Sequence, residues 1–139
     1  MRNLLLVHLE KDLVEALAVL THSLLMEIHL HDCTIFTACS SHEAIEIVER
    51  QPIDLLLADY DLPEMNGLDL IRTVHIRGWK NIARIITAHA CMVDYLIDIS
   101  RGYGVDMVVR TPIQREELKQ LLRRFLIGDS WMDRRGAGN

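Results

Sequence analysis

The amino-acid sequence predicts a doubly wound α/β fold built on one five-stranded parallel sheet. Two observations lead to this prediction: five short apolar segments of strand length recur along the chain, and each precedes a stretch with apolar residues at helical spacing. Parallel strands need long crossovers, and helical crossovers cover both sheet faces, so such strands are almost continuously apolar. The right-handed crossover rule then favours the strand order 2-1-3-4-5.

The expected strands and helices alternate along the whole chain. The strand segments are rich in apolar or β-branched residues and lie at residues 3–8, 33–39, 53–58, 83–88 and 106–109. The helical segments are residues 12–26, a stretch that Ser40 or Ser41 can cap, and residues 67–78, 92–100 and 115–127. Gly78 is well placed to end the third helix, since glycine readily adopts the left-handed conformation found after helix ends.

Length and composition fit a single domain. The chain has 139 residues, of which 50% are hydrophobic and only 5% aromatic, and this is enough for one core. We expect the domain to span residues 1–128. Residues 129–139 lack periodicity and are typical of a flexible C-terminal tail.

Charge and hydropathy argue against two classes of partner. The net charge of −5 disfavours a large phosphate-binding surface, so nucleic acid is not the expected ligand. The apolar runs are too short to cross a bilayer and no apolar leader is recognisable, so we expect a cytoplasmic protein without a membrane partner. The three cysteines are scattered and lack the spacing of a zinc site or a disulfide framework.

The segment "ADYDLPEMNG" at residues 58–67 draws attention because an aspartate ends a buried strand. Burying a carboxylate is costly unless the group is used. In sheets of this class, functional groups gather beyond the carboxyl ends of the strands. We therefore expect one shallow cleft formed by the residues that end the first, third, fourth and fifth strands: His8, Leu9 and Glu10, then Asp59, then Thr87, and finally Arg110 and Thr111.

These residues carry a resemblance to a known family. The stretch "LLLADYDLPEMNGLDLI" resembles the phosphoacceptor segment of response regulator receiver domains, with Pro63 four residues and Gly67 eight residues after Asp59. "IITA" and "TPIQREEL" are similar to the end of the family's fourth strand and to the turn into its last helix, so the resemblance covers about residues 3–127. It implies a flavodoxin-like receiver fold and a role in two-component phosphorelay signalling, without enzymatic activity of its own.

The resemblance also implies a role for individual residues. Asp59 would be the phosphoacceptor, modified by a histidine kinase or a phosphotransfer protein. Asp61 would offer its backbone carbonyl to Mg²⁺, and Thr87 would hydrogen-bond the phosphoryl oxygens. The output would be an interaction with a partner protein, or a homodimer, through the fourth helix, the fifth strand and the fifth helix.

The first strand departs from the family pattern at the metal site. Receiver domains usually end this strand with two adjacent acidic residues that hold Mg²⁺, whereas this sequence has His8 and Leu9 there. Mg²⁺ prefers hard oxygen ligands in octahedral geometry, and neither side chain supplies one. Glu10 lies one residue too late and remains an uncertain ligand. We therefore expect Mg²⁺ binding to be weak or absent, and Leu9 to fill part of the space that the ion would occupy.

The fifth strand departs from the pattern as well. Thr111 stands where the family has a lysine that pairs with the aspartyl phosphate, and a hydroxyl cannot replace that charge. Arg110 is adjacent, but neighbouring side chains on a strand point to opposite faces, so we expect it to point away from Asp59. Val108 occupies the usual position of the aromatic switch residue. The sequence thus favours an atypical, degenerate receiver that is weakly phosphorylated or works without phosphate.

A second class stays open beside the receiver. The chain could be a small α/β nucleotide-binding protein or an enzyme unrelated to phosphorelay. The sequence shows no glycine-rich phosphate loop and no nucleophile elbow to support that alternative.

Overall fold

The centre of the molecule is a sheet of five parallel strands. The computed structural model describes residues 1–128, and the expected tail at residues 129–139 lies outside the described residues. The strands are β1 (Arg2–Val7), β2 (Cys33–Ala38), β3 (Leu55–Asp59), β4 (Ala83–Ala88) and β5 (Met107–Arg110). They pair in the order β2-β1-β3-β4-β5, which confirms both the predicted fold class and the predicted strand order.

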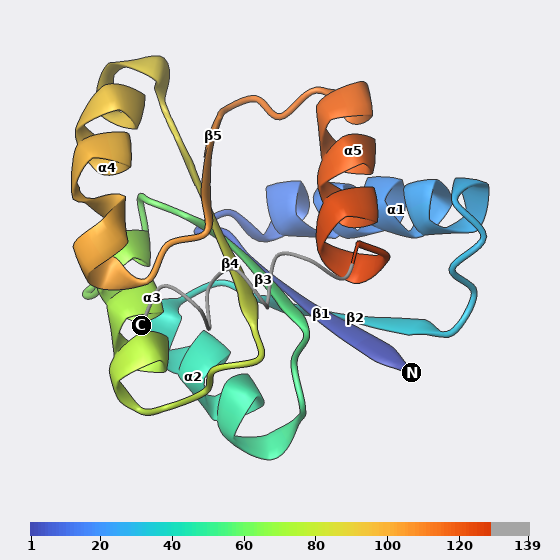
Figure 1. Ribbon diagram of the computed structural model, residues 1–139, viewed down its shortest axis with the longest axis horizontal. Helices are drawn as coiled ribbons and strands as arrows, with labels where there is room; N and C mark the ends of the chain where they lie inside the picture. The colour runs from blue at the N-terminus through green and yellow to red at the C-terminus, as the bar shows by residue number, and fades with distance from the viewer. Residues whose placement is uncertain (129–139) are drawn as a thin grey trace.

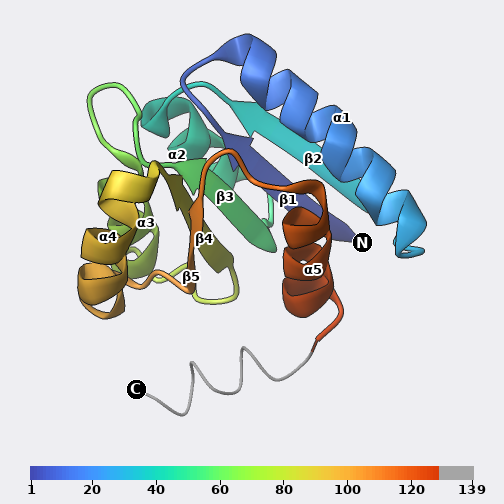
Figure 2. The same cartoon turned by 90° about the horizontal axis from the view of Figure 1, so that it is seen from above.

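Five helices cover the sheet in two layers (Figure 1). They are α1 (Lys11–Glu27), α2 (Ser41–Arg50), α3 (Gly67–Ile76), α4 (Ala90–Tyr103) and α5 (Arg115–Leu126). Figure 2 shows α1 and α5 on one face of the sheet and α2, α3 and α4 on the other. Within residues 1–128, none of the helices is long and apolar enough to span a membrane.

The two layers enclose two apolar cores, one on each face of the sheet. Alternation along β1 sends Leu4 and Leu6 into the core beneath α1 and α5, and Leu5 and Val7 into the core beneath α2, α3 and α4. All four side chains are at most 2% exposed. This explains why the strands are mostly apolar, since both of their faces are covered.

The structure moves several of the expected boundaries. β1 ends at Val7, so His8 is the first residue beyond the strand. β5 begins at Met107 and ends at Arg110, one residue later at each end than the expected residues 106–109. The fourth helix extends beyond the expected residues 92–100 at both ends, to Ala90–Tyr103. Apolar periodicity underestimated this helix because Leu96 is its only buried residue, which leaves little pattern at either end.

Capping residues define the start of α2 and the end of α3. The Ser40 hydroxyl accepts the Glu43 N–H at 3.2 Å, so Ser40 is the N-cap of α2. Ser41 is instead buried, and its hydroxyl donates to the carbonyl of Met65 at 2.6 Å. Gly78 follows the end of α3 with φ of +85°, which confirms that it terminates this helix.

A buried arginine near the amino-terminal end of β4 connects two segments by hydrogen bonds. Arg84 is 1% exposed, and its guanidinium donates to the carbonyls of Trp79 at 3.0 Å and Gly104 at 3.1 Å. Its backbone N–H donates to Asp106 Oδ2 at 2.8 Å. The apolar pattern of this strand gave no role to Arg84. The residue ties the α3–β4 connection to the end of α4.

Gly104 allows this close approach, and a pair of glycine substitutions tests it. Gly104 has φ of +79°, and a Cβ there would lie 2.8 Å from Arg84 Nη1. We expect Gly104→Ala to lower the free energy of unfolding by about 1–3 kcal/mol. Gly102 lies in α4 and has open space where a Cβ would lie, so Gly102→Ala should leave stability unchanged or raise it by about 0.5–1 kcal/mol. Urea denaturation measures both, and equal effects would contradict the account.

Candidate functional site

The carboxyl ends of three neighbouring strands meet at one edge of the sheet. Asp59 and Thr87 are direct partners in the β3–β4 register. Val7 pairs with Ala58, so His8 follows at the level of Asp59, and the His8 N–H still donates to the carbonyl of Ala38 in β2. Alternation places His8, Asp59 and Thr87 on the face covered by α1 and α5. The expected convergence of these strand ends is therefore present in the structure.

Two hydrogen bonds hold the Asp59 carboxylate. The hydroxyl of Thr87 donates to Oδ1 at 2.8 Å, and the backbone N–H of Asp61 donates to Oδ2 at 3.2 Å. Thr87 is only 7% exposed, whereas Asp59 is partly exposed at the rim. Both carboxylate oxygens thus have a partner while the group remains accessible to a ligand from solvent. A carboxylate in this setting can act as a nucleophile or as an anionic ligand.

The turn after β3 folds tightly back on the strand end. The Tyr60 N–H donates to the carbonyl of Thr87 at 2.7 Å, and the Gly67 N–H donates to the carbonyl of Tyr60 at 2.9 Å. A Cβ on Gly67 would overlap the carbonyl oxygen of Asp59. Glycine is therefore required at the first position of α3. Sequence analysis used Gly67 as part of a spacing pattern, but it did not predict this contact with the candidate nucleophile.

The residues after β1 do not build an acidic cluster. His8 Nδ1 accepts the backbone N–H of Glu10 at 3.0 Å, so this ring nitrogen is already engaged. Glu10 is the N-cap residue of α1 and is exposed. Leu9 is 50% exposed, so about half of its side-chain surface is covered.

The donor set does not fit the magnesium ion that the family resemblance implies. In residues 1–128, no group of three or more His, Cys, Asp or Glu side chains is placed to hold a metal. Asp59 and the Asp61 carbonyl remain as oxygen donors, with Glu10 outside any such group. Mg²⁺ gives up its bound water reluctantly, and a single carboxylate offers little binding free energy in exchange.

The end of β5 brings a neutral hydroxyl to the same edge. The Thr111 N–H donates to the carbonyl of Ala88, next to Thr87, at 2.9 Å. Val109 lies in the core beneath α1 and α5, whereas Val108 packs on the opposite face. By alternation, Arg110 shares the face of Val108 and not that of Asp59, as expected from the sequence. Val108 is partly buried and pairs with Ile86.

Comparison with known proteins places this fold and site in a family. The sequence model of the response regulator receiver domain matches residues 13–123, which is most of the chain. The chain therefore belongs to the response regulator receiver domain family and is a receiver module of two-component signalling. The match begins at residue 13 and therefore does not include His8 and Leu9.

Curated relatives are larger proteins. TorR, the TorCAD operon transcriptional regulatory protein of Escherichia coli, is 30% identical over 93 residues, which are 67% of this chain and 39% of TorR. AlgB, the alginate biosynthesis transcriptional regulatory protein of Pseudomonas aeruginosa, is 30% identical over 115 residues, covering 76% of this chain and 25% of AlgB. The chain thus spans well under two thirds of the length of these relatives.

Solved structures share the fold at low sequence identity. A response regulator receiver domain protein from Clostridium thermocellum has a TM-score of 0.75 at 20% identity, with 100% of both chains covered. The receiver domain of a sensor histidine kinase from Pseudomonas aeruginosa has a TM-score of 0.73 at 20% identity, covering 90% of this chain and 97% of that one. The latter structure contains a magnesium ion coordinated in its active site cleft.

A double-mutant cycle tests the bond between Thr87 and Asp59. We expect Thr87→Val and Asp59→Ala to show a coupling free energy of about 1 kcal/mol in urea denaturation, because the hydroxyl bonds a charged group in a largely buried position. Thr87→Ser keeps the donor and serves as the matched control, which should retain most of the coupling. Additive effects of Thr87→Val and Asp59→Ala would show that the bond contributes nothing.

Proposed function

We propose that this receiver uses Asp59 as its phosphoryl-accepting residue only weakly, and that it signals mainly through protein contacts that do not require phosphate. The observation that carries the proposal is the Asp59 carboxylate, which is bonded by Thr87 and Asp61 but lies outside any cluster of metal-binding side chains among residues 1–128. The nucleophile is retained, while the groups that would neutralise charge during phosphoryl transfer are not.

The chemistry that remains is modest. Attack by an Asp59 oxygen on a phosphodonor would form an acyl phosphate and break the bond between phosphorus and the donor's leaving group. Thr87 would reposition its hydroxyl from the carboxylate to a phosphoryl oxygen, a short move because the hydroxyl already donates to Oδ1. Thr111 would offer a dipole where a lysine would offer a full charge. The incoming negative charge would therefore stay poorly compensated.

The unmodified site already holds Thr87 against Asp59, and this supports output without phosphate. Phosphorylation acts as a switch by pulling a nearby group towards new oxygen acceptors. Here the hydroxyl of Thr87 lies 2.8 Å from a carboxylate oxygen before any modification. Val108 also lacks the aromatic ring that would change position together with the hydroxyl. The conformational change that phosphorylation would cause is correspondingly small.

The surface formed by α4, β5 and α5 is the proposed output face. Of the 14 residues of α4, only Leu96 is buried, so the helix presents most of its surface to solvent. Tyr95 and Ile97 are each 52% exposed, so both side chains are open to contact with a partner. This surface would bind an output protein or a second copy of the chain. A histidine kinase or phosphotransfer protein is the proposed partner at Asp59, and the cytoplasm is the proposed location.

The proposed output does not involve catalysis. A nucleotide-binding protein or enzyme remains the second candidate from sequence, but no observation on residues 1–128 favours it. Binding of a nucleotide by the purified chain would revive that alternative.

Exposure to a small phosphodonor tests the proposal. Incubation with acetyl phosphate and Mg²⁺, followed by intact-mass measurement, should give a phosphoryl adduct on the unmodified chain at least about tenfold more slowly than on a restored variant. The restored variant carries His8→Asp, Leu9→Asp and Thr111→Lys, which supply the acidic pair and the missing ammonium group.

The control is the same restored variant with Asp59→Asn, which should give no adduct because the nucleophile is removed. Rapid, Mg²⁺-dependent labelling of the unmodified chain at Asp59 would overturn the proposal of a weakly phosphorylated receiver. Failure of the restored variant to label faster would show that the altered positions are not the cause of slow labelling.

A further inference from the structure

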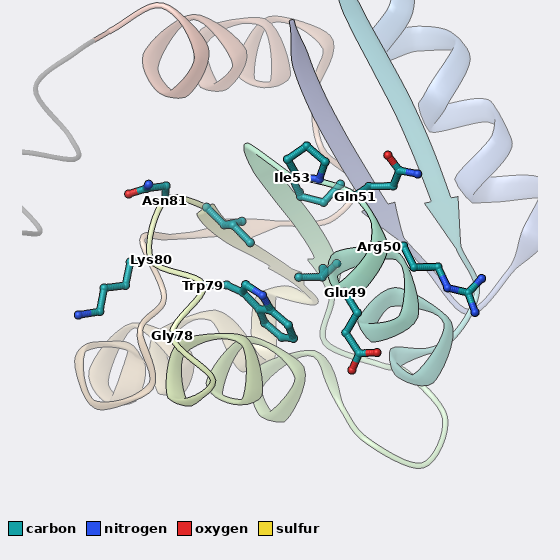
Figure 3. Close-up of a pocket in the computed structure, with 11 residues that line it drawn as sticks. Glu49, Arg50, Gln51, Ile53, Gly78, Trp79, Lys80 and Asn81 are labelled. Atoms are coloured by element: carbon teal, nitrogen blue, oxygen red, sulfur yellow. The ribbon is translucent and has the colours of Figure 1, made fainter.

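A concave surface lies at the opposite edge of the sheet from Asp59. It is a groove of about 410 Å³ (Figure 3). One side is formed by the end of α2 and the α2–β3 connection, and the other side by the α3–β4 connection. Ile53 and Ile82 lie just before β3 and β4 begin, so the groove is at the amino ends of these strands. Asp59 ends β3 at the carboxyl edge. A ligand in the groove would not cover the candidate phosphoacceptor.

The floor of the groove is apolar. Val48, Ile53 and Ile82 line it and are each at most 5% exposed, because they also belong to the core beneath α2, α3 and α4. Trp79 forms a half-buried wall, and Figure 3 shows its indole directed towards Glu49. A partly exposed tryptophan beside a small apolar floor is a typical anchor point for an apolar side chain from a partner.

The charges around the groove are predominantly positive. Glu49 is neutralised by Arg77, whose Nη1 lies 3.0 Å from Glu49 Oε1 and whose guanidinium is 5.9 Å from the Trp79 ring centroid. Arg50 and Lys80 are exposed and make no ion pair with any residue in 1–128. The chain as a whole carries a net charge of −5. This local excess of cations on an acidic protein favours an anionic ligand.

The placement of the two cations favours an extended ligand. Figure 3 shows Lys80 and Arg50 on opposite sides of Trp79, with their side chains directed away from each other. Cations placed like this do not converge on one phosphate group, as a nucleotide site would need. Two flanking cations are also too few for the electrostatic footprint of a nucleic-acid surface. They suit a segment that crosses the groove and carries acidic residues on both sides of an apolar one.

We propose that this groove, with Trp79 as its wall and Arg50 and Lys80 at its ends, binds an acidic peptide segment of a partner protein. An apolar side chain of that segment packs on Trp79, Ile53 and Ile82. Its flanking carboxylates meet Arg50 and Lys80, while Arg77 keeps Glu49 from repelling them. The proposal does not depend on the role of Asp59, because the two sites lie at opposite ends of β3.

A titration with a defined probe tests the groove. The probe is the acetylated, amidated pentapeptide Glu-Asp-Leu-Asp-Glu, added to the ¹⁵N-labelled full chain and followed by heteronuclear NMR. We expect saturable shifts of the Trp79 indole N–H and of the amides of residues 48–53 and 78–82, with a Kd on the order of 1 mM for so short a probe. A Trp79→Phe variant identifies the indole signal, because the chain has two tryptophans.

Charge-reversal variants separate this groove from general electrostatic attraction. Arg50→Glu with Lys80→Glu should weaken probe binding at least about fivefold, since both flanking contacts turn repulsive. The matched control, Lys11→Glu with Arg123→Glu, makes the same change in net charge at exposed positions on other surfaces and should leave the affinity unchanged. Asp59→Asn should also have no effect, so this test stands apart from the test of phosphorylation.

Four outcomes would overturn the proposal. They are an absence of saturable shifts at the groove, equal weakening by both pairs of charge reversals, equal binding of a probe with Lys in place of its acidic residues, and equal binding of a probe with Gly in place of Leu. A single-stranded oligonucleotide that shifts the groove residues when the acidic probe does not would assign the surface to nucleic acid instead.

Discussion

The pairing of β3 with β4 is the constraint on which the rest of the site depends. Its register sets Asp59 directly opposite Thr87 at the last position of β3. The hydroxyl then reaches the carboxylate at 2.8 Å without any loop having to place it. Because β1 pairs with β3 in a matching register, the residue after β1 is brought to the same level. The chemistry of the edge is therefore decided by which side chains the sequence places at these fixed positions.

This constraint gives the altered residues their importance. A receiver with acidic residues after β1 would hold carboxylates beside Asp59, and their repulsion would be relieved by a bound cation. Here the first of these positions is an imidazole whose Nδ1 accepts the Glu10 N–H, and the second is a half-exposed leucine. With fewer carboxylates at the rim, there is less charge repulsion for a cation to relieve. The same fold can thus keep its nucleophile and lose the surrounding electrostatics.

The sequence predicted what depends on periodicity and missed what depends on contacts between distant segments. The strand order and the proximity of Asp59 to Thr87 followed from apolar periodicity and from parallel topology. The buried Arg84 was missed because its partners are carbonyls of Trp79 and Gly104, which carry no sequence signal. The groove beside Trp79 was missed for a related reason: its two walls come from connections far apart in the chain. The end of β1 was placed one residue too late, at His8 instead of Val7.

Titration calorimetry with Mg²⁺ tests the central claim most directly, namely that this edge keeps the nucleophile without a working metal site. The unmodified chain should give no saturable heat at Mg²⁺ concentrations up to about 1 mM, whereas His8→Asp with Leu9→Asp should bind the ion saturably in that range. Saturable binding of Mg²⁺ by the unmodified chain below about 1 mM would contradict the account, and it would show that Glu10 or another oxygen donor completes the site.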